Sequence, residues 1–134
     1  MDIPVPSLRR NELYRGFKIC IRRSERHRWG VFALRDIQKD EMLEEAPYFS
    51  VPCEEIEASP SCRVYSYWLC DGYMLIGTGF ASLYNHSYEP NADYQVDKIN
   101  EIIRHYAIKD IKAGEEIVIN YGEENAKDFL SSEG

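Results

Sequence analysis

The sequence predicts one mostly-β domain built from several small sheets. Short runs of β-branched and aromatic residues recur along the chain, and Gly, Pro, Asn or Asp bounds each run, which is the pattern of strands joined by turns. No segment carries the long 3.6-residue apolar period of an amphipathic helix. The length of 134 residues, 44% of them hydrophobic, suits a single domain with one core.

Three strands are expected in the first part of the chain. Residues 17–21 alternate between apolar and polar side chains and predict the first strand, which a charged turn over 22–28 follows. Residues 29–34 predict the second strand. After a turn over 36–41, residues 42–51 predict a third strand that ends near Pro52.

The middle of the chain predicts a helical turn and a hairpin. The acidic residues 54–60 can hold one helical turn, which Pro60 should end. Residues 64–69 and 73–76 are β-prone, and the Asp-Gly pair between them at 71–72 is a strong signal for a tight hairpin turn.

The last strands are expected as one more pair and a final single strand. Residues 92–96 and 102–108 should pair across a turn near Asn100, and residues 117–121 follow a turn over 112–114. We therefore predict an N-terminal arm over 1–14, one domain over 15–122 and a tail over 123–134. For the tail, a short helix and a frayed end are the two alternatives.

Composition excludes several classes of function. The formal net charge of −7 argues against generic nucleic-acid binding and suits a basic partner such as a Lys-rich peptide. No apolar run approaches the ~20 residues that cross a bilayer, and the N-terminus lacks the apolar centre of a signal peptide. We therefore expect a soluble, intracellular protein without membrane or direct nucleic-acid partners.

The cysteines and histidines do not predict a metal site. The cysteines form no Cys-x-x-Cys pair and have no His at zinc-finger spacing, so we expect them to be reduced and mostly buried; they are Cys20, Cys53, Cys62 and Cys70. His27, His86 and His105 lie too far apart in sequence to suggest a common metal and are interpreted as structural or surface residues.

Two stretches concentrate the residues that could form a site. In GTGFASLYNHSYEPNA, residues 77–92, a run of Asn, His, Ser and Pro predicts a compact, rigid loop. The other stretch is GEEIVINYG, residues 114–122. Neither matches a phosphate-binding loop or a zinc-protease motif, and adjacent Ser87 and His86 do not form a plausible catalytic triad because no partner acid is evident.

Together these stretches resemble the paired signature of SET-domain protein lysine methyltransferases. Asn-His-Ser-x-x-Pro-Asn-Ala ends the first, and Gly-Glu-Glu-Ile-x-Ile-Asn-Tyr-Gly forms the second. Residues 28–37, RWGVFALRDI, resemble the family's Gly-x-Gly-Val-x-Ala segment, and Lys-Asp-Glu at 39–41 stands where the family has Lys-Gly-Glu. The resemblance covers about residues 15–122 and is strongest to short stand-alone viral and bacterial SET proteins. It implies a SET-domain, β-clip-like fold with a C-terminal pseudoknot.

The resemblance also implies an activity and a site. The expected reaction transfers a methyl group from S-adenosylmethionine to a lysine side chain and leaves S-adenosylhomocysteine; a histone tail is the commonest target, which would place the protein in the nucleus, and otherwise in the cytoplasm. Tyr121 is the implied catalytic tyrosine, and no metal is implied. The implied cofactor-binding residues are Arg28, Trp29, Gly30, Asn85, His86 and Tyr121. The implied lysine channel comprises Trp29, Tyr65 or alternatively Tyr67, and Ile119, two residues before Tyr121.

Three departures from the family pattern keep alternatives open. Arg28 replaces the first Gly of the family segment, and Ile119 stands where Phe or Tyr influences the number of methyl groups added. The Cys-rich flanking segments are missing, so residues 121–130 or a second subunit, in a homodimer, would close the channel. The alternative function is a catalytically inactive SET-like module that binds a peptide or protein. Glu44, Glu45, Glu115 and Glu116 are interpreted as residues of solvated turns.

Overall fold

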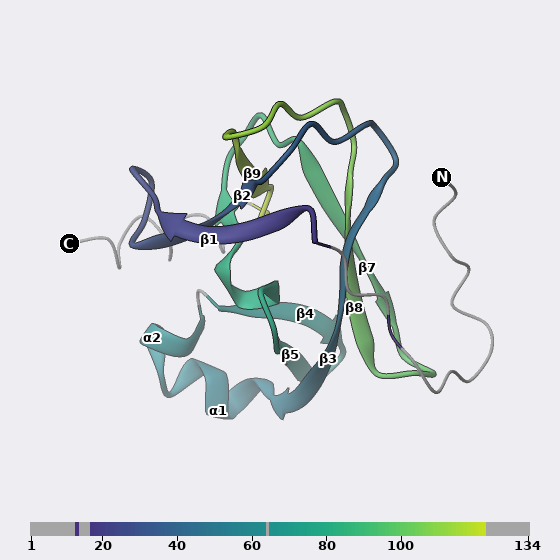
Figure 1. Cartoon of the computed structure of the whole chain (residues 1–134). Helices are drawn as coiled ribbons and strands as arrows, with labels where there is room; N and C mark the ends of the chain where they lie inside the picture. The colour runs from purple at the N-terminus through teal and green to yellow at the C-terminus, as the bar shows by residue number, and fades with distance from the viewer. Residues whose placement is uncertain (1–12, 14–16, 64, 123–134) are drawn as a thin grey trace.

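The computed structural model describes residues 13, 17–63 and 65–122, and the polypeptide is folded into short strands with two small helices (Figure 1). The predicted tail and all of the predicted arm except Leu13 lie outside the described residues. The elements are β1 (Ile19–Arg23), β2 (Trp29–Ala33), β3 (Met42–Pro52), α1 (Cys53–Glu57), α2 (Pro60–Arg63), β4 (Ser66–Cys70), β5 (Tyr73–Gly77), the 3-10 helix η1 (Ala81–Leu83), β6 (Asn85–His86), β7 (Ala92–Asp97), β8 (Ile102–Ala107) and β9 (Glu116–Ile119).

Two sheets organise these strands. The smaller has the order β1-β2-β9-β6, and the larger has the order β4-β5-β3-β8-β7. All neighbours in the larger sheet are antiparallel, whereas β6 and β9 of the smaller sheet run parallel. A parallel pair of such short strands needs a long connection, and here β7, β8 and the loop after β8 supply it. The mostly-β prediction is therefore confirmed.

Each predicted strand has a counterpart, but β1 extends to Arg23 into the predicted turn, β6 lies in the predicted loop, and the helices differ around Pro60. The β4–β5 hairpin turns at Asp71-Gly72, where Gly72 takes a φ of 83° that favours glycine. The predicted helical turn is α1, but Pro60 begins the second helix, α2, instead of ending the first. Proline is well tolerated at the first position of a helix because its missing N–H has no helical partner there.

A fully buried ion cluster joins the strands of the larger sheet. Arg104 on β8 lies opposite Glu45 on β3, and its Nη2 is 3.0 Å from Glu45 Oε2 and 3.6 Å from Asp97 Oδ2. Glu44 is half-buried and accepts a hydrogen bond from the Phe80 N–H at 2.8 Å. The expectation that both glutamates belong to a solvated turn was wrong, because both lie within the long strand β3 and face other elements.

Two further predictions concern the cysteines and membrane-spanning helices. All four cysteines are free, as predicted, but three are half-buried and Cys62 is exposed, so the expectation of mostly buried thiols was wrong. Within residues 17–63 and 65–122, no helix has the length and apolar character needed to cross a membrane.

Candidate active site

The two signature stretches meet in the parallel pair of β6 and β9. Asn85 pairs with Val118 and His86 with Ile119. The Ser87 N–H extends the pairing by donating to the Ile119 carbonyl at 2.9 Å. Residues about 30 positions apart in sequence therefore form one structural unit, as the implied pseudoknot required.

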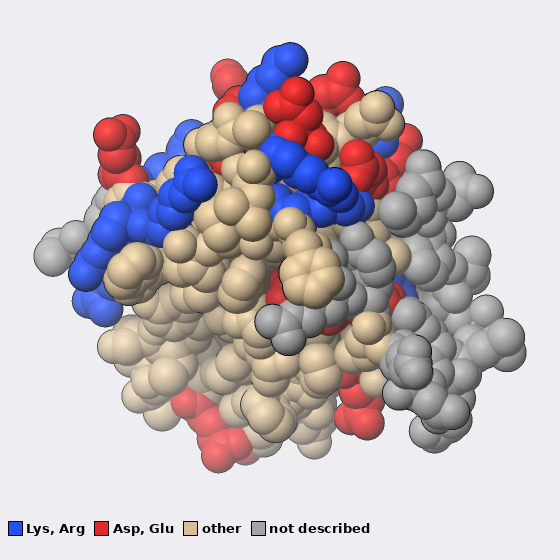
Figure 2. All heavy atoms as spheres, in the orientation of Figure 1, with Lys and Arg blue, Asp and Glu red and all other residues tan. Residues whose placement is uncertain are grey.

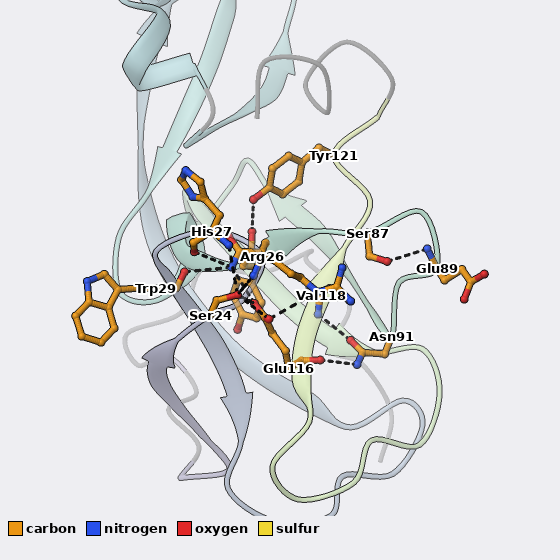
Figure 3. Close-up of polar contacts among 12 residues, drawn as sticks. Ser24, Arg26, His27, Trp29, Ser87, Glu89, Asn91, Glu116, Val118 and Tyr121 are labelled. Atoms are coloured by element: carbon orange, nitrogen blue, oxygen red, sulfur yellow. Dashed lines mark hydrogen bonds and ion pairs between the residues drawn. The ribbon is translucent and has the colours of Figure 1, made fainter. Parts of the chain in front are cut away.

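Asn91 fastens the loop to the tail strand. Its Oδ1 accepts from the Val118 N–H at 2.8 Å, and its Nδ2 donates to the Glu116 carbonyl at 2.9 Å (Figure 3). One amide side chain, as both donor and acceptor, thus replaces two ladder partners along the edge of β9 that faces away from β2, and this explains why an asparagine suits this position.

Asn85 and Glu116 form a polar centre behind the turn between β1 and β2. Asn85 Nδ2 lies 3.2 Å from the carbonyls of both His27 and Trp29, and 2.8 Å from Glu116 Oε2. The Glu116 carboxylate also accepts from the Ser24 hydroxyl at 2.8 Å (Figure 3). The interpretation of Glu116 as a solvated turn residue was wrong, since its side chain is only 11% exposed. Glu115, in contrast, is exposed as expected.

Gly30 and Arg28 occupy restricted positions next to this centre. A Cβ at Gly30 would come within 2.3 Å of Glu116 Oε2 and 3.0 Å of Asn85 Nδ2, so only a glycine leaves room for their contact. Arg28 has a φ of 37°, in the left-handed region that favours glycine. The departure at Arg28 therefore changes the residue but keeps the backbone conformation that a glycine would adopt readily.

Gly30→Ala is expected to lower the free energy of unfolding by about 1–3 kcal/mol, because the added methyl group overpacks a rigid polar centre. Urea denaturation measures this change. Gly72→Ala is the matched control: open space surrounds Gly72, so its cost comes from its positive φ alone. If Gly30→Ala unfolds at the wild-type urea concentration, the close packing of Gly30 on Glu116 is incorrect.

A pocket of about 380 Å³ opens in front of the polar centre. The turn between β1 and β2 forms one wall of this pocket. The exposed arginines of the turn belong to the blue group at the left of Figure 2. The guanidinium carbon of Arg23 lies 4.2 Å from the centroid of the Trp29 ring, which holds both side chains at the pocket wall. The lining residues are Arg23, His27, Arg28, Trp29, Tyr65, Ser82, Leu83, Asn85 and Tyr121.

A narrow pocket of about 10 Å³ adjoins the larger one. Five tyrosines dominate its walls, and the lining residues are Tyr65, Ser66, Tyr67, Ala81, Ser82, Tyr84, Tyr94 and Tyr121. Tyr65, Ser82 and Tyr121 line both pockets. The two pockets therefore meet beside Tyr121; the narrow pocket has room for about one water molecule, so its tyrosine walls would have to move apart to admit a slender chain.

Tyr121 is held at this junction by both its backbone and its hydroxyl. Its N–H donates to His86 Nδ1 at 3.0 Å, and its hydroxyl donates to the Tyr84 carbonyl (Figure 3). Burial raises the pKa of the Tyr121 hydroxyl well above its ordinary value. The group therefore stays a neutral hydrogen-bond donor and does not act as a base at neutral pH.

The structure distributes the implied site residues unequally. Arg28, Trp29, Asn85 and Tyr121 line the large pocket, Tyr67 lines the narrow pocket and Tyr65 lines both. Gly30 and His86 line neither of these two pockets. Gly30 instead leaves room for the Asn85–Glu116 contact, and His86 accepts the Tyr121 N–H. Ile119 is fully buried in the core and also lines neither. Within the described residues, no group of three His, Cys, Asp or Glu side chains could hold a metal ion.

Several lining residues had no clear signal in the sequence. Tyr84 and Tyr94 are strand or loop aromatics like any others until the fold brings them together, and Ser82 and Leu83 lie in a run that reads as apolar core. The sequence is rich in tyrosine, with ten in 134 residues, but this composition does not indicate which tyrosines lie at the site.

The model of the SET-domain family matches residues 28–122, which contain both signature stretches, the whole lining of the narrow pocket and the lining of the large pocket except Arg23 and His27. The chain belongs to the SET-domain family. A curated relative from Schizosaccharomyces pombe, a histone-lysine N-methyltransferase specific for H3 lysine-37, is 34% identical over 106 residues, or 77% of this chain and 72% of the relative. The predicted family is thus confirmed.

Solved structures agree with this assignment. A candidate histone methyltransferase from Plasmodium falciparum has a TM-score of 0.66 and 35% identity, covering 79% of this chain and 94% of that chain. A humanized Chaetomium thermophilum Polycomb Repressive Complex 2 bound to the inhibitor GSK126 has a TM-score of 0.64 and 26% identity, covering 78% of this chain and 15% of that chain. The fold of this protein is the SET-domain fold.

Proposed function

We propose that this SET-domain protein is a lysine N-methyltransferase that uses S-adenosylmethionine and acts on a histone tail in the nucleus. The observation that carries the proposal is the junction of the two pockets at Tyr65, Ser82 and Tyr121. The names of the relatives support lysine methylation of a histone. The net charge of −7 suits a basic tail as the partner.

The residues of the large pocket fit the proposed cofactor. Its volume of about 380 Å³ lies within the range of small-molecule sites. Exposed guanidinium groups of Arg23 and Arg28 would hold a carboxylate, and the flat Trp29 ring offers an apolar surface for an adenine. Asn85 and Gly30 would fix the backbone of the β1–β2 turn, and with it the positions of Arg23 and Arg28. When bound, S-adenosylmethionine supplies a methyl group activated by a sulfonium.

The chain contributes positioning and exclusion of water. A lysine has an ordinary pKa of about 10.4, and burial among the tyrosines of the narrow pocket disfavours its charged form, so the neutral amine can attack. The protonated Tyr121 hydroxyl and the Tyr84 carbonyl orient the reacting groups. Alignment of two reactants can supply much of the acceleration without a general base.

Thermal unfolding with S-adenosylhomocysteine tests the cofactor site. Ligand at 100 times its dissociation constant is expected to add about 2.7 kcal/mol to the free energy of unfolding, because it binds the folded state alone. Adenosine at the same concentration is the control, since it lacks the carboxylate that Arg23 and Arg28 would bind. Methyl transfer from labelled cofactor to histone H3 then tests the reaction.

One observation favours a second function. Arg28 places a long side chain at the pocket wall where the family pattern has glycine, and this could obstruct the cofactor. The second function is a catalytically inactive module that binds a peptide through the same pockets. Absence of any thermal shift at saturating S-adenosylhomocysteine would favour this module and contradict the enzyme. Closure of the channel by a second subunit stays a prediction.

A further inference from the structure

His105 lies at the centre of the tyrosines that form the narrow pocket. It is fully buried on β8, and the strand register places it opposite Tyr94 of β7 and Glu44 of β3. Its ring stacks on Tyr84 with centroids 3.9 Å apart and planes 11° apart. Its Nε2 is 3.0 Å from the Tyr67 hydroxyl. His105 lines neither pocket, yet the tyrosines around it do.

The hydrogen bonds of Tyr67 define the tautomer of this histidine. The Tyr67 hydroxyl has one hydrogen, and it donates this hydrogen to the Ala81 carbonyl oxygen 2.6 Å away. Nε2 of His105 must then carry a hydrogen and donate it to the Tyr67 oxygen. Burial lowers the pKa of His105 to about 3, so the neutral imidazole persists at physiological pH.

This arrangement leaves one polar atom without compensation. In the Nε2-protonated imidazole, Nδ1 is an acceptor, and here it is buried without a hydrogen-bond partner among the described residues. A buried unpaired acceptor destabilises the folded state. A phenylalanine would preserve the stacking on Tyr84 without this cost, so packing alone does not account for a histidine at position 105.

We propose that His105 is a positioning residue for methyl transfer, which fixes the rings of Tyr67 and Tyr84 and thereby the width of the narrow pocket that receives the lysine. The inference rests on the proposed function, because it concerns the same reaction. A positioning role and a merely structural role predict opposite effects of His105 on the stability of the fold. A structural histidine would stabilise the fold, whereas a positioning histidine with an unpaired nitrogen does not.

His105→Phe is expected to lower kcat about 3- to 10-fold, since small displacements of groups that align a reaction have effects of this order or larger. The dissociation constant of S-adenosylhomocysteine should stay the same, because the residues that His105 contacts do not line the large pocket. The Tm should equal or exceed that of the wild type. Tyr106→Phe, the next residue on β8, is the matched control and should change none of the three.

A double-mutant cycle tests whether His105 acts through the Tyr67 hydroxyl. In the Tyr67→Phe background, His105→Phe should have little further effect on kcat, because the two groups form one unit. His105→Gln, which keeps an N–H donor, should retain more activity than His105→Phe and also covers the case in which the phenylalanine variant does not fold. Additive effects, or equal losses in Gln and Phe variants, would overturn the inference.

The outcomes separate this inference from the proposed function. A wild-type protein that methylates no lysine contradicts the function itself. An active wild type with unchanged kcat in His105→Phe, or with a Tm lowered in parallel with kcat, contradicts only the positioning role. Nitrogen-15 NMR of His105 gives a readout without turnover: protonation at Nε2 supports the inference, and protonation at Nδ1 overturns it.

Discussion

Tyr121→Phe is expected to lower kcat about 100-fold or more, the loss typical when one preorganised donor at a reacting centre is removed. The hydroxyl lies where the two pockets meet and donates to the Tyr84 carbonyl. The phenylalanine ring keeps the aromatic contact with His86, whose centroid is 5.2 Å away. Turnover of a histone H3 peptide at saturating substrate measures the change.

The matched control for Tyr121→Phe is Tyr88→Phe. Tyr88 contacts the same His86 ring at 4.4 Å but is 58% exposed and lines neither pocket. Its variant should keep the wild-type kcat. Both variants should retain the thermal shift with S-adenosylhomocysteine, which separates loss of chemistry from loss of binding. Full turnover in Tyr121→Phe would contradict the catalytic role of this residue.

Local patterns were sufficient for most of the fold. The Asp-Gly turn at 71–72 and the alternating runs of β-prone residues located the strands, because turn geometry and strand periodicity depend on neighbours in sequence. The prediction that Pro60 ends a helix was wrong, because proline is also tolerated at the first position of a helix. In the structure α1 ends at Glu57, before Pro60 is reached, and Pro60 begins α2.

Long-range contacts were beyond these patterns. Glu45 and Glu116 looked like ordinary charged residues near turns, and only the pairing of distant strands supplies their partners, Arg104 and Asn85. Tyr121 was predicted because the resemblance singled it out. His105 was not, because its importance depends on stacking and on a hydrogen bond to Tyr67 across 38 residues. Buried polar networks of this kind have no local signature.

Arg104→Met is expected to lower the free energy of unfolding by about 3–5 kcal/mol, the cost of leaving a buried charge without its partner. The side chains of Arg104, Glu45 and Asp97 are all fully buried. Arg104 Nε and Nη2 both contact Glu45 Oε2, at 3.2 and 3.0 Å, so methionine would remove both of these charge-neutralising contacts from a buried carboxylate. Urea denaturation at pH 7 measures the loss.

Two variants show whether the loss comes from the stranded charge. Arg104→Met combined with Glu45→Met should recover much of the stability, because an apolar pair can replace a buried ion pair. Arg26→Met removes a 3.6 Å contact with Glu116 from a side chain that is 47% exposed, and should cost less than about 1 kcal/mol. Equal losses in the Arg26 and Arg104 variants would contradict this account. Because a one-residue slip of β8 would turn both Arg104 and its neighbour His105 away from their partners, the buried pair also fixes the register on which the tyrosine pocket depends.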